Sequence, residues 1–295
     1  MMNNILYAVL LGIVKLHAML PMPVLYLLAD ILYFIIYKIA GYRLKVVREN
    51  LKNSFPEKTA KELREMEKKF YHHFSDYFVE TIKLAHISRE ELNRRARVNN
   101  PEIINPLVAK GHTCFIMLMG HYGNWEWSTG MTEWFGQVKI YHLYRPLTNK
   151  VIDRLLIYLR SRFYNVGIKK HETVREMLRI KQSKERSIVL FIADQTPSKA
   201  NLHYWTTFLN RESAILTGAE RIATKLDIPV IFMDVRKVKR GYYTFEFELI
   251  TDNPRQMPEF WITEEYARRM ERSILREPAY WLWTHRRWKH KRVET

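Results

Sequence analysis

The sequence lacks the residue patterns of several common kinds of active site. It contains 1 cysteine in 295 residues, so an intramolecular disulfide is impossible, and no cysteine–histidine cluster has the spacing of a zinc site. It also has no glycine-rich phosphate-binding loop and no serine nucleophile elbow. Cys114 stands in an apolar run and is expected to be a small core residue in a reducing compartment. Neither a resident metal ion nor a cofactor is predicted.

Acidic residues are scarce relative to basic ones. The chain has 48 Lys and Arg against 31 Asp and Glu, which gives a net charge of +17. Such a balance indicates an anionic partner: nucleic acid, an anionic lipid surface or a phosphorylated substrate. Low-complexity tracts are absent, and 47% of the residues are hydrophobic, so the chain can bury a full core as one large domain or two small ones.

The amino terminus is the most apolar part of the chain. The stretches Ile5–Leu20 and Val24–Ala40 flank a Pro-Met-Pro turn, and the second approaches the length of a membrane span. No basic start or small-residue cleavage site indicates a signal peptide. A pair of buried helices in a soluble protein is one interpretation. We favour a membrane anchor over residues 1–42, as one spanning helix or a shallow helical hairpin.

Basic residues follow these apolar stretches at once, which predicts that residues 43–295 lie on the cytoplasmic side of the membrane. They are Lys38, Arg43, Lys45, Arg48 and Lys52.

The rest of the chain predicts helices first and then alternating strands and helices. Expected strands cover residues 113–119, 138–144, 187–193, 229–235 and 242–250. Expected helices cover residues 58–84, 88–96, 101–110, 150–163, 174–180, 214–225 and 264–276. This order favours an α/β fold with a mainly parallel central sheet flanked by helices. No linker divides the chain after residue 100, so residues 43–295 are predicted to form one catalytic domain.

The first predicted strand leads into the most informative motif. Gly120 ends the apolar run, and His121 and Glu126 follow at a spacing of five residues. Ligand sites of open α/β sheets gather where such strands end. A carboxylate that holds the far ring nitrogen of His121 would fix its tautomer, and the pair could take a proton from a substrate hydroxyl. A histidine near a glutamate can also be a packing residue, and the strand–glycine–histidine context favours chemistry.

Two further strand ends carry polar groups. Arg145 follows the strand at 138–144, and Asp194 and Gln195 follow the strand at 187–193. If the strands are parallel, these groups meet His121 at one edge of the sheet. Together with Arg160, Arg162 and Asn124, they are candidate substrate-binding residues. A base without a protein nucleophile predicts direct transfer to a substrate hydroxyl, and cationic groups would bind phosphate or a developing oxyanion.

At this point the sequence resembles a known family, the lipid A biosynthesis acyltransferases. These late acyltransferases move a fatty acyl chain onto a hydroxyl of a lipid A precursor. The resemblance covers most of the chain, and its pieces occur in order. They are the Arg43 to Glu57 spacing, Gly120 to Glu126, Tyr144-Arg145-Pro146, Ala193-Asp194-Gln195 and Trp283 to Trp288.

The resemblance implies a glycerolipid-acyltransferase-like fold and a site. His121 would be the general base and Glu126 its partner in the H-x4-D/E motif, while Arg160 would help to bind phosphate or the oxyanion. The donor would be an acyl thioester on acyl carrier protein, or acyl coenzyme A. The carrier is acidic, which suits a chain of +17. The enzyme would act at the cytoplasmic face of the bacterial inner membrane in lipopolysaccharide assembly.

Two alternatives remain open at this stage. The residues between His121 and Glu126 are also similar to those of mannoside and aminolipid acyltransferases, so the acceptor could be another membrane lipid. The basic, tryptophan-rich segment 283–292 could belong to a non-enzymatic membrane- or nucleic-acid-binding protein. Because tryptophan and basic residues also suit a membrane interface, and the amino terminus is apolar, we favour the membrane over nucleic acid.

Overall fold

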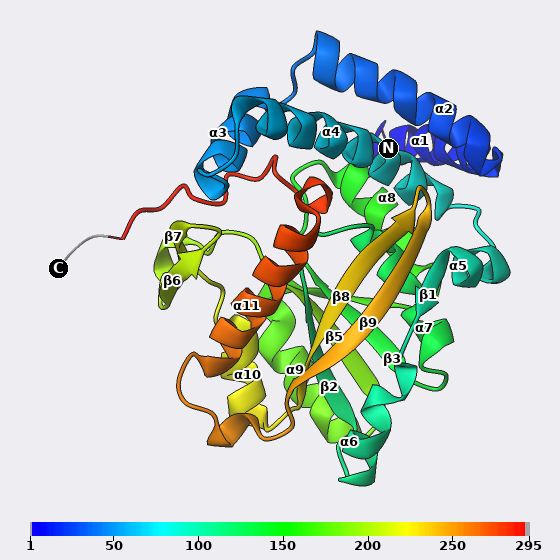
Figure 1. The fold of residues 1–295 in the computed structure, drawn as a ribbon. Coiled ribbons are helices and arrows are strands. Elements are labelled where there is room, and N and C mark those ends of the chain that lie inside the picture. The colour runs from blue at the N-terminus through cyan, green and yellow to red at the C-terminus, as the bar shows by residue number, and fades with distance from the viewer. Residues whose placement is uncertain (1, 293–295) are drawn as a thin grey trace.

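The computed structural model describes residues 2–292, which build one mixed sheet covered by helices (Figure 1). The sheet has 7 strands in the order β1-β9-β8-β2-β5-β3-β4. Every neighbouring pair is parallel except β8 and β9, which form an antiparallel hairpin. The strands are β1 Ala96–Val98, β2 Cys114–Met119, β3 Lys139–Tyr144, β4 Val166–Lys169, β5 Ser187–Ile192, β8 Val230–Lys239 and β9 Tyr242–Thr251. The predicted fold class, a mainly parallel sheet flanked by helices, is confirmed.

The centre of the sheet is strand β2. All six of its residues are buried, and it pairs with β5 on one side and β8 on the other. Cys114 lies in this core as a free thiol, and burial raises its pKa to about 11. A strand covered on both faces needs a continuous apolar run, which is why its position could be predicted from the sequence.

The predicted helices are present with shifted ends, except that residues 101–110 form a 3₁₀ turn and a shorter helix in place of one helix, and that the helix at residues 131–134 was not predicted. Those around the sheet are α4 Ala60–Lys83, α5 Arg89–Arg95, α6 Asn105–Ala109, α7 Met131–Trp134, α8 Lys150–Ser161, α9 Thr173–Ser183, α10 Gly218–Leu226 and α11 Trp261–Arg276. Helix α4 begins at a capping box formed by Thr59 and Glu62. Short 3₁₀ turns complete the body: η2 Pro101–Ile104, η3 Trp125–Gly130, η4 Lys170–Glu172, η5 Lys199–Asn201, η6 Pro254–Gln256 and η7 Pro278–Tyr280.

One expectation about local structure was wrong, and a second helix was not predicted. This unpredicted helix is α3, Leu44–Ser54. The helix expected from residue 214 begins at Gly218. The preceding residues instead form a two-stranded sheet of β6, Trp205–Phe208, and β7, Arg211–Ala214. Leu209 and Asn210 form its turn, at φ 52° and 59°. Glycine usually occupies a position with positive φ in such a turn, and neither residue is glycine.

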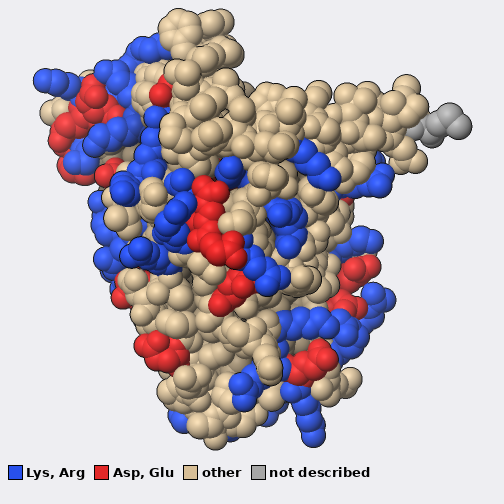
Figure 2. Space-filling model, turned by 90° about the vertical axis from the view of Figure 1, so that its right-hand side faces the viewer, with Lys and Arg blue, Asp and Glu red and all other residues tan. Residues whose placement is uncertain are grey.

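The amino-terminal stretches form helix α1, Met2–Met19, and helix α2, Met22–Tyr33, which continues as a π-helical segment, η1 Phe34–Ile39. Both are long and apolar enough to cross a membrane, and only 11% and 22% of their residues are buried in the protein. They are therefore not core helices. Helix α2 packs on α4, and α1 packs on α4 and α8. Figure 2 shows their uncharged surface as a layer along one end of the molecule, with Lys and Arg below it. The domain boundary at residue 42 stays a prediction.

Candidate active site

His121 stands just past the carboxyl end of β2, in a position set by tight packing. A side chain at Gly120 would overlap the thioether of Met270 on α11. Gly123 has φ +61°, and a Cβ there would come 2.8 Å from Val235. Glycine is the residue that tolerates both conditions. The chain can therefore turn sharply after β2 and leave the His121 ring at the edge of the sheet.

The carboxylate that holds His121 is Asp194, at the end of the neighbouring strand β5. The His121 Nδ1 atom lies 2.7 Å from Asp194 Oδ1, and the His121 backbone N–H donates to Asp194 Oδ2 at 3.0 Å. The indole N–H of Trp281 also donates to Oδ2, at 2.7 Å. Burial would raise the pKa of Asp194, but His121 and these hydrogen bonds lower it to about 2. Asp194 is thus an anion that keeps the proton of His121 on Nδ1.

The expected contact between His121 and Glu126 is therefore corrected. Among the described residues, Glu126 bonds Arg160, whose Nε and Nη2 donate at 2.8 and 2.5 Å. The hydroxyl of Tyr77 donates at 3.3 Å and the indole of Trp125 at 3.2 Å. Burial would raise the pKa of Glu126, but Arg160 lowers it. A spacing of five residues turns the two side chains in different directions, because η3 begins between them.

Trp125 connects Glu126 to His121 by packing. Its ring lies 5.1 Å from the His121 ring in an edge-on arrangement and stacks on Tyr77 at 4.1 Å. Since the indole N–H also bonds Glu126, the Glu126–Arg160 ion pair fixes the ring against which His121 rests. Glu126 is therefore connected to His121 indirectly, through the Trp125 ring.

The second ring nitrogen of His121 points away from Asp194. Its nearest polar neighbour is the amide nitrogen of Gln195, 3.4 Å from Nε2. The His121 side chain keeps 19% of its surface exposed, while that of Asp194 keeps 2%. A buried anion behind the ring and an accessible Nε2 in front form the arrangement in which a histidine takes a proton from a hydroxyl.

The other candidate residues separate into two groups. Gln195 and Asp194 lie at His121, as the strand order required. Asn124 is fully buried, donates to Glu80 at 2.6 Å and accepts from the Trp127 N–H. Arg162 donates to the carbonyls of Leu84 and Ile87. Asn124 and Arg162 thus hold the fold together locally, and among the described residues neither forms a hydrogen bond with His121.

Arg145 has a different place again. It is exposed just beyond the end of β3, at the same edge of the sheet as His121 because β3 runs parallel to β5. Arg145 is thus available to a substrate at this edge in a way that Arg162 is not.

Sequence reasoning missed the contribution of the carboxyl-terminal segment. Trp281 binds Asp194, and Nε2 of His285 accepts from the Thr196 N–H at 3.3 Å. Burial lowers the pKa of His285 to about 4, so its ring is neutral. Arg287 is buried, donates to the Ala214 carbonyl at 2.6 Å, and has a pKa lowered by burial to about 10. The tryptophan-rich composition was the available signal, but it was interpreted as a membrane interface, a nucleic-acid patch or a family motif, and not as support for the histidine.

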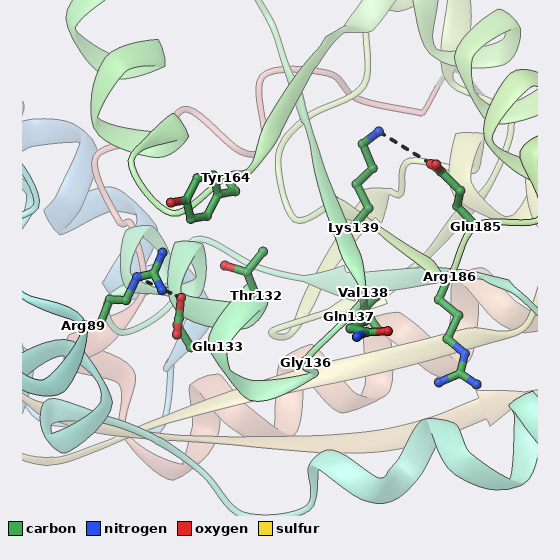
Figure 3. Close-up of a pocket in the computed structure, with 10 residues that line it drawn as sticks. All are labelled: Arg89, Thr132, Glu133, Gly136, Gln137, Val138, Lys139, Tyr164, Glu185 and Arg186. Atoms are coloured by element: carbon green, nitrogen blue, oxygen red, sulfur yellow. Dashed lines mark ion pairs between the residues drawn. The ribbon is translucent and has the colours of Figure 1, made fainter.

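One hollow of the surface lies apart from this chemistry. It has a volume of about 860 Å³ and is formed where β3 and β5 begin, opposite the edge that holds His121, and its lining includes the ion pairs Arg89–Glu133 and Lys139–Glu185 (Figure 3). A smaller cavity, about 40 Å³, borders Glu126, Arg160 and His142. It has room for water-sized molecules only.

The fold and the site define an α/β enzyme with a histidine–carboxylate pair at the carboxyl ends of parallel strands. The model of the bacterial lipid A biosynthesis acyltransferase family matches residues 2–290, and the chain belongs to this family. It is similar to the lipid A biosynthesis lauroyltransferase of Escherichia coli strain K12, at 27% identity over 286 residues, which cover 95% of this chain and 90% of that protein. The chain is therefore an acyltransferase of lipid A biosynthesis.

Proposed function

We propose that the protein transfers a fatty acyl chain from an acyl thioester to a hydroxyl of a lipid A precursor, with His121 as the general base. The observation that carries the proposal is the contact of 2.7 Å between His121 Nδ1 and the buried Asp194. It leaves Nε2 as the proton acceptor and keeps a counter-charge ready for the imidazolium. No protein nucleophile is required.

The reaction then proceeds by direct attack. His121 Nε2 takes the proton of the acceptor hydroxyl as its oxygen attacks the thioester carbonyl. The new C–O bond forms, the C–S bond breaks, and the sulfur leaves with the proton returned by His121. Asp194 stays ionised throughout and stabilises the charged ring, and the Gln195 amide stands next to the proton-transferring nitrogen.

The net charge and the exposed apolar surface indicate the partners of the protein. A net charge of +17 suits an acidic acyl carrier protein as the donor and an anionic lipid as the acceptor. The exposed apolar face of α1 and α2 suits attachment to the inner membrane from the cytoplasmic side. Helix α4 connects α2 to the His121 loop, because Tyr26 of α2 and Asn124 of the loop both donate to Glu80 of α4. The site thus lies on the membrane side of the protein.

The test is turnover with purified donor and acceptor. We expect His121→Ala and Asp194→Asn each to lower kcat about 10²–10⁴-fold, because each removes part of the base. Asp194→Asn keeps the shape of the side chain and removes its charge. Because the pKa of Asp194 is about 2, a loss of activity between about pH 4 and 7 must be caused by the titration of another group.

Mass spectrometry of the acceptor lipid measures the reaction. Thioesters of acyl carrier protein and of coenzyme A are compared as donors. Near-wild-type turnover in Asp194→Asn would contradict the role given to the pair. Transfer from the coenzyme A thioester alone would contradict the proposed carrier.

A further inference from the structure

A hollow between helices α1 and α8 contains two cations, Lys15 and Arg154. Its volume is about 570 Å³, and its lining includes Asn4, Tyr7, Gly12 and Lys15 of α1 and Arg154 of α8. Among residues 2–292, neither Lys15 nor Arg154 forms an ion pair. The nearest acid in sequence, Asp153, accepts instead from the Leu147 N–H at 2.7 Å. Two positive charges thus remain available to a ligand.

Each helix supports the cation of the other. The Arg154 guanidinium carbon lies 3.9 Å from the ring centre of Tyr7, and the Lys15 ammonium lies 5.5 Å from that of Tyr158. Arg154 Nη1 also donates to the Asn4 side chain at 3.2 Å. These contacts hold both side chains in place. They use one of the five guanidinium N–H groups and none of the ammonium ones, so most donors stay free.

The position of the hollow indicates which anion it meets. Both helices that form the hollow also expose apolar side chains outside its lining: Leu6, Val9 and Ile13 on α1, and Ile152 and Ile157 on α8. If α1 attaches to a bilayer as proposed above, its Lys15 and the neighbouring Arg154 lie close to the headgroups, where lysine and arginine bind lipid phosphate. Helices α1 and α8 lie side by side at the end of the molecule that carries the apolar layer (Figure 1).

We propose that the α1–α8 hollow binds the phosphate of an anionic lipid headgroup, with Lys15 and Arg154 as its ligands. The inference rests on the membrane attachment proposed above and not on acyl transfer. Vesicle binding therefore tests the hollow, while turnover tests the reaction, and either can fail without the other.

Two variants remove the site in different ways. Lys15→Gln with Arg154→Gln removes the charges. Gly12→Leu keeps them and fills the hollow, because a Cβ at Gly12 meets no atom within 4 Å, and leucine favours the helix more than glycine does. The matched control is Arg221→Gln with Lys225→Gln, two exposed cations on the remote helix α10.

The experiment measures co-sedimentation of the full chain with phosphatidylcholine vesicles that contain phosphatidate, or a carboxylate lipid at equal surface charge. We expect the wild type to prefer phosphatidate, and both site variants to bind those vesicles roughly tenfold less tightly, while the control binds as the wild type. Equal loss in the control, no preference for phosphatidate, or unchanged binding of Gly12→Leu would each overturn the proposal.

A second measurement distinguishes the two sources of the phosphate. A higher KM of the site variants for a phosphorylated acceptor, but not for its dephosphorylated form, assigns the hollow to the acceptor. An unchanged KM together with lost vesicle binding assigns it to the surrounding phospholipid.

Discussion

Asp194 and Glu126 are both buried carboxylates near His121, and their partners separate their roles. Asp194 bonds the ring itself and stays charged because three donors surround it. Glu126 forms an ion pair with Arg160 and is connected to the histidine only through Trp125. Asp194 therefore fixes which ring nitrogen carries the proton, while Glu126 and Arg160 act on the position of the ring.

At the residue scale, we predict that Glu126→Gln lowers stability as well as activity. The substitution leaves the Arg160 guanidinium without a counter-charge, which costs about 3 kcal/mol for a buried pair, and the Glu126 side chain is only 4% exposed. Urea unfolding of purified protein measures the change.

The control is Glu176→Gln, which breaks the Glu176–Arg179 pair, where Arg179 is 56% exposed. That change should cost less than about 1 kcal/mol. Equal stability of the two variants would show that the buried pair does not support the site.

At the scale of elements, the strand ends and helix α11 together place the histidine. Strand β2 delivers His121 and β5 delivers Asp194 to one edge, because the two strands are parallel and in register from Cys114 opposite Ser187 to Met119 opposite Ile192. Helix α11 packs against the turn at Gly120. The hydroxyl of Tyr266, also on α11, donates to the Met119 carbonyl at 2.9 Å.

We predict that Gly120→Ala displaces this turn. The added methyl group would overlap Met270, which should cost about 1–3 kcal/mol and lower kcat, because His121 moves relative to Asp194. In a Met270→Ala background the same change should cost less, with a coupling energy above about 0.5 kcal/mol in a double-mutant cycle.

Gly218→Ala serves as the control, because a Cβ there meets no atom within 4 Å. It should be neutral. Additive costs of Gly120→Ala and Met270→Ala would contradict the packing argument.

At the scale of the whole molecule, the apolar helices and the active site lie on the same side. Helix α2 rests on α4, and α4 contributes Tyr77 and Glu80 to the loop that carries His121 and Asn124. The hollow of about 860 Å³ lies at the opposite edge of the sheet. A lipid acceptor held in the bilayer would thus approach the edge at which the histidine stands.

We predict that the triple substitution of Leu6, Val9 and Ile13 by Ser releases the protein from membranes. These side chains are 50–56% exposed, so the folded protein loses little packing, while the bilayer loses three apolar contacts of up to about 1.5–3 kcal/mol each. Flotation with vesicles measures the release.

The matched control replaces Val174, Val238 and Leu275 by Ser, three apolar side chains on the body that are 54–65% exposed. It should stay bound. Retention of the α1 variant, or release of the control, would show that α1 is not the attachment.

The strands and the two apolar helices could be predicted from the sequence, since a continuous apolar run is a local property. The sequence also predicted that His121, Asp194 and Gln195 lie close together, because parallel strands end at one edge of the sheet. The hairpin of β6 and β7 could not be predicted, because its turn residues carry no glycine signal. The short strand β4 was also missed, because its four residues contain one buried side chain.

By itself, the sequence determined the family, the parallel sheet and the place of His121 at a strand end, since each depends on residues close together in the chain or on strand order. Only the tertiary structure decided which acid holds that histidine. Asp194 lies 73 residues away, and side-chain direction after a strand depends on the packing of α11 and η3, which no local spacing reveals. The same holds for Lys15 and Arg154, whose meeting requires two helices to lie side by side.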